Sequence, residues 1–170
     1  MTWPVFPGVW LDIDNSITQL YCCVMVPSFT STGNLPPGIH WVSWDELCER
    51  FGYNPHRTWL IKGLEIALRE LAKAGCKTVY VDGSFVTAKE IPGDYDGCWS
   101  IVDVDKPEQL DPILLHQRGR EAMQEKYRGD LFPAELPEGV SGRLFLDFFQ
   151  MDKATGEPKG IVALDIRAML

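Results

Sequence analysis

The feature that most constrains the fold is an amphipathic pattern over residues 55–74. Apolar side chains recur along it at helical spacing, and most of the charged side chains fall on the opposite side. Asn54 can cap the first turn, Pro55 suits the first helical position, and Gly75 suits the left-handed residue after the end. The pattern therefore predicts a long helix that buries one face and leads into the next element of the chain.

A short run rich in β-branched and aromatic residues follows at positions 78–82, and it predicts a strand. Gly83-Ser84 comes directly after it and predicts a turn that leaves a hydroxyl and free backbone N–H groups. A polar connection leads into a second expected strand over residues 95–104. We therefore expect two consecutive strands joined through the Gly-Ser turn.

The remaining elements are shorter. Ser43 and Glu46 have the spacing of a capping box and predict a helix that ends near Phe51. Further expected elements are a strand at 20–26, helix at 111–127 with Gly119 a weak point, a connection at 129–142, and strands at 143–150 and 161–166. A Ser-, Thr-, Gly- and Pro-rich stretch predicts a boundary between an N-terminal appendage or extra strand, residues 1–33, and a main domain, residues 34–170.

Composition and charge argue against several classes of protein. The net charge of -8 disfavours bulk electrostatic binding to DNA or RNA, although a small anion carried with a metal ion remains compatible. The five cysteines are odd in number and form no Cys-x-x-Cys pair, which disfavours a zinc site or a disulfide framework. No run approaches the ~20 apolar residues of a membrane span. We expect a cytoplasmic protein.

Paired carboxylates mark the candidate chemistry. Three Asp-x-Asp pairs occur: Asp12 and Asp14, Asp94 and Asp96, and Asp103 and Asp105. Only Asp94 and Asp96 follow both a predicted strand and a Gly-Ser turn. Residues two apart in a strand share a face, roughly 7 Å apart, and two such carboxylates repel unless a cation lies between them. Mg²⁺ commonly joins one or two carboxylates to substrate phosphates, so this pair is the candidate metal site.

A third carboxylate on a neighbouring strand would complete a two-metal site. Asp147 is the candidate, because it stands within an apolar run where a charge is costly unless it is paired or liganded. Ser84 and the backbone N–H groups near Gly83 are candidates for holding phosphate oxygens.

Gly83-Ser84, followed after a short spacer by Asp94-Tyr95-Asp96, resembles the signature of the polymerase-β-like nucleotidyltransferase superfamily. Much of the chain also resembles a bacterial family of nucleotidyltransferase-like proteins. The segments that carry this second resemblance are Asn54-Pro-His-Arg57, Asp82-Gly-Ser-Phe-Val-Thr-Ala-Lys89, Tyr127-Arg-Gly-Asp-Leu-Phe-Pro133 and Pro158-Lys-Gly-Ile-Val162. Relatives in the superfamily include small antibiotic-modifying enzymes and the nucleotidyltransferases of toxin–antitoxin pairs.

The resemblance implies an α+β fold with a small mixed sheet backed by helices, of the polymerase-β palm type. It also implies Mg²⁺ or Mn²⁺ and a nucleoside triphosphate, with Asp94, Asp96 and Asp147 as catalytic metal ligands. The sequence departs from the usual pattern at Thr87 and Ala88, where minimal members often carry Arg and Gly. Lys89 is then the candidate to bind the triphosphate as a point charge.

Two functions are compatible with this pattern. The first is transfer of a nucleoside monophosphate to a hydroxyl on a protein, an RNA or a small molecule. The second is a catalytically idle module on the same fold, which binds a partner protein or senses a nucleotide in a toxin–antitoxin or phage-defence setting.

Overall fold

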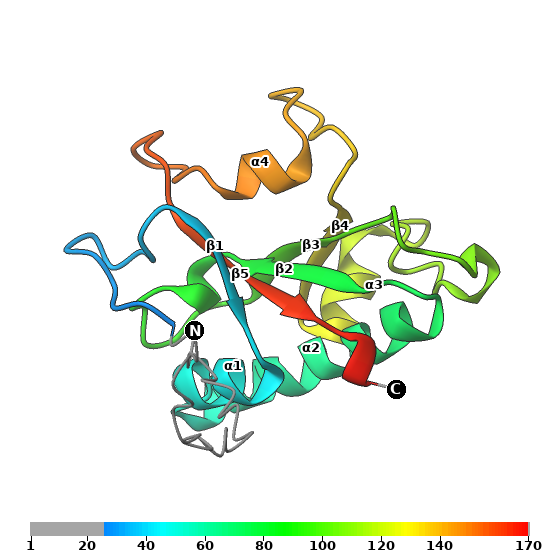
Figure 1. Cartoon of the computed structure of the whole chain (residues 1–170), viewed down its shortest axis with the longest axis horizontal. Helices are drawn as coiled ribbons and strands as arrows, with labels where there is room; N and C mark the ends of the chain where they lie inside the picture. The colour runs from blue at the N-terminus through cyan, green and yellow to red at the C-terminus, as the bar shows by residue number, and fades with distance from the viewer. Residues whose placement is uncertain (1–25, 170) are drawn as a thin grey trace, which may run out of the picture.

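The computed structural model describes residues 26–169, which form an α+β fold around one mixed sheet (Figure 1). The strands are β1 (Gly38–Val42), β2 (Thr78–Asp82), β3 (Tyr95–Trp99), β4 (Gly129–Pro133) and β5 (Gly160–Asp165). The helices are α1 (Trp44–Phe51), α2 (Pro55–Lys73), α3 (Gly119–Tyr127) and α4 (Phe145–Phe149), with short 3₁₀ turns at Ser84–Val86, Pro107–Gln109 and Arg167–Met169.

The sheet has the strand order β1-β5-β2-β3-β4. β1 and β5 are parallel, as are β3 and β4, whereas β2 is antiparallel to both of its neighbours. Helices α1, α2 and α3 lie on one face of the sheet and α4 lies on the other (Figure 1). Residues of β3 and β4 pack on both layers, since Trp99 and Leu131 lie in the core on the α2 side while Cys98 and Phe132 pack with α4.

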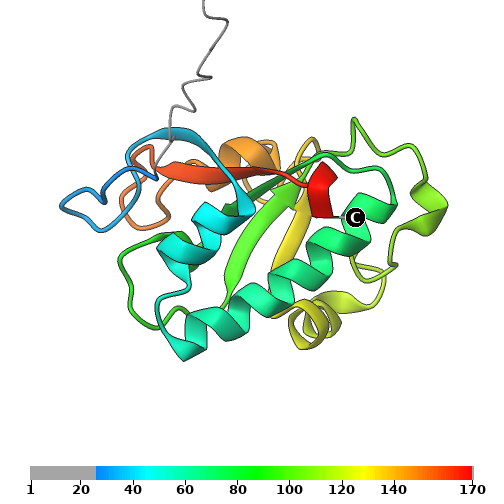
Figure 2. The same cartoon turned by 60° about the horizontal axis from the view of Figure 1, so that its bottom comes forward.

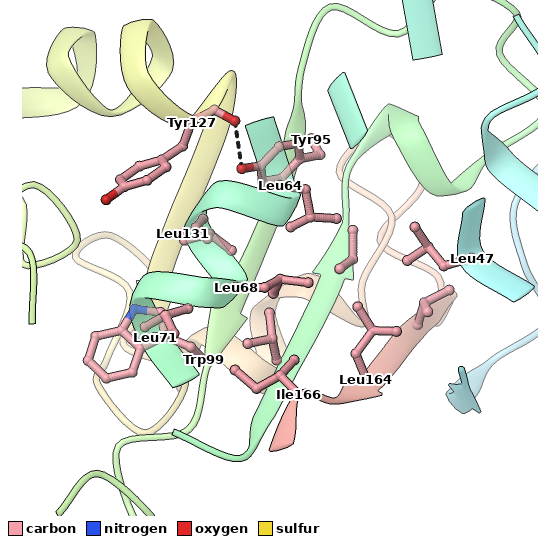
Figure 3. Close-up of a cluster of buried hydrophobic side chains, with 14 of the residues drawn as sticks. Leu47, Leu64, Leu68, Leu71, Tyr95, Trp99, Tyr127, Leu131, Leu164 and Ile166 are labelled. Atoms are coloured by element: carbon pink, nitrogen blue, oxygen red, sulfur yellow. Dashed lines mark hydrogen bonds between the residues drawn. The ribbon is translucent and has the colours of Figure 1, made fainter. Parts of the chain in front are cut away.

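The main core lies between α2 and the sheet. Figure 2 shows that α2 runs along this face of the sheet. Leu64, Leu68 and Leu71 of α2 are fully buried against residues of the strands, including Leu131 and Trp99 (Figure 3). Burying a leucine side chain stabilises a fold by about 1.5–3 kcal/mol, so this helix face contributes a large share of the stability.

The two N-terminal helices agree with the sequence pattern. Asn54 accepts a hydrogen bond from the Arg57 amide at the start of α2, and Gly75 after its end has a φ of 91°. Ser43 and Glu46 form the predicted capping box of α1. Local side-chain and backbone chemistry was sufficient to place both helices.

Several predicted elements differ from the structure. β1 and β4 were not predicted, and β4 lies within the stretch interpreted as a connection. The strand expected at 95–104 ends at Trp99, and residues 112–118 form turns before α3 begins. The strand expected at 20–26 and the pair Asp12 and Asp14 lie outside the described residues, apart from Val26, which is in no strand.

The predicted strand at 143–150 is wrong, because this segment contains α4. Phe145, Phe148 and Phe149 are spaced as on one helix face, and they cluster with Phe132 on the sheet. An apolar run this short fits both a strand and a helix by its pattern alone. Packing of these phenylalanines against the sheet favours the helical conformation of residues 145–149.

Candidate functional site

A row of carboxylates crosses three adjacent strands. Asp82 of β2 is the register partner of Asp96 of β3, and Asp96 is the register partner of Asp130 of β4. Register partners in a sheet point to the same face. Cys98, two residues after Asp96, packs with Phe149 of α4, so the row lies on the α4 face.

Asp94 joins this row from just before β3. The side-chain amide Nε2 of Gln124 donates to Asp94 Oδ2 and to Asp130 Oδ2, at 3.1 Å in each case. Tyr95 between the two aspartates is buried on the opposite face, where its hydroxyl donates to the Tyr127 carbonyl (Figure 3). The structure therefore brings Asp94 and Asp96 together on one face, as the sequence predicted.

The Gly83-Ser84 turn lies directly against Asp96. Gly83 has a φ of 79°, and a Cβ at this position would come within 2.6 Å of Asp96 Oδ2 and 2.8 Å of Asp96 N. Glycine is therefore required here both by the backbone conformation and by the close approach of the carboxylate. Ser84 then begins a 3₁₀ turn, and its carbonyl accepts from Thr87 Oγ1 at 2.8 Å.

The start of α2 holds the loop that connects Ser84 to Asp94. The Arg57 side chain is fully buried and donates hydrogen bonds to five backbone carbonyls, those of Phe51, Phe85, Thr87, Lys89 and Glu90. Asn54 Nδ2 also donates to the Glu90 carbonyl at 3.0 Å, and the His56 ring is hydrogen-bonded to the Pro92 carbonyl. The segment from Asn54 to Arg57 thus fixes the loop that carries the turn to β3.

The two outer carboxylates of the row are neutralised by cations of the protein. Lys159 forms an ion pair with Asp82, and Arg120 Nε donates to Asp130 Oδ2 at 2.6 Å. Among residues 26–169, Asp96 has no ion pair. The central position of the row is therefore the one that lacks a counter-charge in direct contact.

The environment of Asp96 disfavours its ionised form. Burial raises the pKa of Asp96 to about 6, the nearby Lys153 ammonium opposes this shift, and the charges of Asp94, Asp82 and Asp130 add to it. Burial also raises the pKa of Asp82, against the opposing effect of Lys159. A cation that bound beside Asp96 would reverse this unfavourable electrostatic balance.

A cavity of about 280 Å³ opens on Asp82 and Asp96 of this carboxylate row. Its wall on the sheet side includes Asp82, Gly83, Ser84 and Asp96, and its other wall comes from α4 and the turn that follows. That second wall includes Phe148, Phe149, Met151, Lys153 and Lys159. The cavity thus combines carboxylates, a hydroxyl and two ammonium groups.

Two predicted site residues lie elsewhere. Asp147 is exposed on α4 and lines a separate cavity with Arg143 and Gln150, so the position on a neighbouring strand for which it was chosen is wrong. Lys89 is exposed and does not line the cavity at Asp96, although its carbonyl accepts from Arg57. Neither position supports the predicted role, which was metal ligand for Asp147 and phosphate-binding residue for Lys89.

Residues that the sequence prediction missed lie at the carboxylate row and its cavity. Asp147 was chosen because it is a carboxylate within an apolar segment, and Asp130 shares this feature. Asp130 was not chosen because residues 129–142 were interpreted as a connection, whereas residues 129–133 form β4. Lys159 lies in one of the segments that carry the family resemblance, but that segment gave it no role. Arg120, Gln124 and Lys153 carry no local pattern that separates them from ordinary surface residues. Only the folding of α3 and of the turn after α4 onto the sheet brings them to the carboxylates.

The donor set fits a metal ion that is shared with phosphate. Within the described part of the chain, no three His, Cys, Asp or Glu side chains are arranged to hold a metal by themselves. Mg²⁺ needs only one or two carboxylates when waters and phosphate oxygens complete its shell. Asp130 Oδ1 is buried without a hydrogen-bond partner, and Asp94 and Asp96 supply further carboxylate oxygens on the same face.

The fold and this carboxylate face define a small α+β protein with a polar cavity against one face of a mixed sheet. Residues 27–165 match a protein family described as a family of unknown function (DUF6932), and the chain belongs to this family. Neither the comparison with curated proteins nor the comparison with solved structures found a match. Among residues 26–169, no helix is both long and apolar enough to cross a membrane.

Proposed function

We propose that this chain is a nucleotidyltransferase of the polymerase-β-like type, which transfers a nucleoside monophosphate from a nucleoside triphosphate to a hydroxyl acceptor. The observation that carries the proposal is the position of Asp96. It is the central carboxylate of a row of three, it lies against the Gly83-Ser84 turn, and it has no ion pair among the described residues.

The strand order supports the proposal. A Gly-Ser turn joins antiparallel strands β2 and β3, and α3 connects β3 to the parallel strand β4. This connection places Asp130 beside Asp96, where the sequence-based interpretation required a third carboxylate on a neighbouring strand. Asp94 and Asp96 are thus the proposed metal-binding residues, and Asp130 is the third carboxylate beside them. The prediction that Asp147 is a ligand is tested by mutagenesis.

Each residue has a role in the proposed transfer. The acceptor hydroxyl oxygen attacks the α-phosphorus, the bond from that phosphorus to the bridging oxygen breaks, pyrophosphate leaves with the electron pair, and the hydroxyl proton is released to solvent. Ser84 and the backbone N–H groups beside it orient phosphate oxygens. Asp94 and Asp96 would hold Mg²⁺, which supplies charge stabilisation for the transferring phosphoryl group. Arg57 does not contact the substrate in this proposal, and it fixes the loop between Ser84 and Asp94.

The test is calorimetry with Mg²⁺ and each of the four nucleoside triphosphates, followed by transfer of label from the α-phosphate to a panel of protein, RNA and small-molecule acceptors. We expect Asp96→Asn to weaken Mg²⁺–nucleotide binding by about tenfold or more and to abolish transfer. Asp103→Asn is the matched control, because Asp103 belongs to another Asp-x-Asp pair and forms an ion pair with Lys77 away from the cavity. Absence of nucleotide binding by the wild-type chain would contradict the proposal.

A second candidate is the idle module, and the ion pairs of the outer carboxylates favour it. Arg120 contacts Asp130 and approaches Asp94 to 3.7 Å, so the protein itself supplies a cation where a metal would be shared. The Arg120 side chain is 62% exposed, which leaves it room to move away when a ligand binds.

Arg120→Ala separates the two candidates. If Arg120 only replaces a lost metal, the variant should bind Mn²⁺ more tightly than the wild type, and neither should bind nucleotide. If the site is active, Arg120 faces bound phosphate, and the variant should bind the Mg²⁺–nucleotide complex more weakly. Mn²⁺ and nucleotide titrations of both proteins decide between these outcomes.

A further inference from the structure

A lysine that forms no ion pair with any residue of 26–169 lines the cavity. Lys153 lines the cavity that contains Asp96 and Ser84, and its ammonium lies 5.7 Å from the centre of the Phe148 ring. Among residues 26–169 this side chain forms no ion pair and no hydrogen bond of its own. It is close enough to Asp96 and Asp82 to oppose the effect of burial on their pKa values.

The backbone that presents Lys153 is fixed. Asp152 Oδ1 accepts from the amides of Ala154 and Thr155 at 2.9 and 3.0 Å, and the Asp152 amide donates to the Glu157 carbonyl at 2.8 Å. These bonds close a tight turn directly around the lysine. The position of the Lys153 backbone is therefore set before any ligand arrives, and only the side chain has to be ordered.

The same turn is tied to the Gly-Ser loop. Asn34 Nδ2 donates to Asp152 Oδ2 at 2.8 Å, and the neighbouring Gly33 carbonyl accepts from the Ala88 amide at 2.8 Å. A single segment of the chain thus holds both the loop after Ser84 and the turn that carries Lys153. The hydroxyl and the ammonium face one cavity because this segment connects their two supports.

Two other lysines, Lys159 and Lys89, are less suited to bind an anion here. Lys159 also lines the cavity, but its side chain is only 11% exposed and is paired with Asp82. Lys89, the candidate from the sequence, does not reach the cavity wall. A cavity that holds several carboxylates needs an uncommitted cation if it is to accept a highly charged anion.

We infer that Lys153 binds the triphosphate of the nucleotide in this cavity, opposite Ser84, in the role that the sequence assigned to Lys89. The inference rests on the proposed function and adds to it the residue that recognises the polyphosphate. It also implies that inorganic triphosphate binds with Mg²⁺ without any base or sugar.

The experiment is calorimetry of the full chain with Mg²⁺ and inorganic triphosphate, together with Mn²⁺ titrations that contain no phosphate. We expect Lys153→Gln to weaken triphosphate binding by about tenfold, the loss of one charge-assisted contact. The same variant should bind Mn²⁺ at least as well as the wild type, because a positive charge near the carboxylates has been removed. Lys62→Gln on the exposed side of α2 is the control with the same change in net charge.

Each outcome decides the inference. Weaker triphosphate binding in Lys89→Gln with no change in Lys153→Gln would overturn it and leave the proposed function intact. A loss of both triphosphate and Mn²⁺ binding in Lys153→Gln would show a change in the site as a whole and would also overturn it. If the wild-type chain binds neither triphosphate nor any nucleotide with Mg²⁺, the inference and the proposed function both fail.

Discussion

Asp96 and Asp130 are register partners on the parallel strands β3 and β4, and their side chains lie on the same face of the sheet. Asp130 is 1% exposed, accepts from Arg120 and Gln124 through Oδ2, and keeps Oδ1 without a partner. The carboxylate on the strand next to Asp96 is therefore that of Asp130. It is not that of Asp147, which lies on helix α4.

Replacing Asp130 tests that assignment. We expect Asp130→Asn to weaken binding of the Mg²⁺–nucleotide complex by about tenfold or more, because Asp130 lies beside Asp96 and accepts the hydrogen bonds that orient Arg120 and Gln124 around it. Asp147→Asn is the matched comparison from the helix above the sheet. Calorimetry on both variants gives the answer, and a loss confined to Asp147→Asn would return the third ligand to α4.

The pKa of Asp96 predicts a pH dependence of the free energy of unfolding. Its value in the folded chain, about 6, lies above the ordinary 3.8, so between these pH values the folded state binds more protons than the unfolded state. The contribution of Asp96 is therefore fully present below about pH 4 and is lost as the pH rises through 6, by about 2–3 kcal/mol.

Urea denaturation at a series of pH values, with a chelator present, measures this effect. Asp96→Asn should remove the fall between pH 4 and 6, because an amide does not titrate. Asp82 has a shift of the same sign and remains in both proteins, so the difference between the two curves isolates Asp96. Parallel curves for the variant and the wild type would contradict the assigned environment.

Gly83 should not tolerate a side chain. Gly83→Ala places a Cβ within 2.6 Å of Asp96 Oδ2 at a φ of 79°, so we expect a loss of about 2–4 kcal/mol in the free energy of unfolding. Gly93→Ala is the control, since a Cβ at Gly93 would meet no atom within 4 Å and the φ of this residue is not left-handed. Denaturant unfolding of the two variants should differ by at least 1.5 kcal/mol, roughly the cost of the strained conformation alone.

Arg57 should be the most sensitive charged residue of α2. Arg57→Ala leaves several buried carbonyls without a donor, and we expect a loss of about 3–5 kcal/mol. Lys73→Ala on the same helix removes an exposed ion pair with Glu70 and should cost less than about 0.5 kcal/mol. Chemical denaturation measures both changes.

Hydrogen exchange adds a local measurement for Arg57. The conservative variant Arg57→Lys keeps the charge but not the planar fork of donors, so it cannot reach all five carbonyls. Amides of residues 84–92 should then exchange faster than in the wild type, while those of the buried strands stay protected. Unchanged exchange in this loop would contradict the role of Arg57 in fixing it.

The sequence determined those parts of the protein that depend on neighbours in the chain. The helix α2 with its Asn54 cap, the capping box of α1, the Gly83-Ser84 turn, and the shared face of Asp94 and Asp96 all follow from short-range geometry. Each of these patterns is complete within a few residues, so no knowledge of the sheet was needed.

Only the tertiary structure decided which distant residues complete the carboxylate row and its cavity. Pairing of β3 with β4 places Asp130 beside Asp96. Packing of three phenylalanines against the sheet makes residues 145–149 a helix, so Asp147 is not on a strand next to Asp96. The turn after α4 brought Lys153 and Lys159 to the cavity, while the loop fixed by Arg57 kept Lys89 out of it. Strand register and helix packing depend on contacts between segments far apart in the chain, and no local pattern contains them.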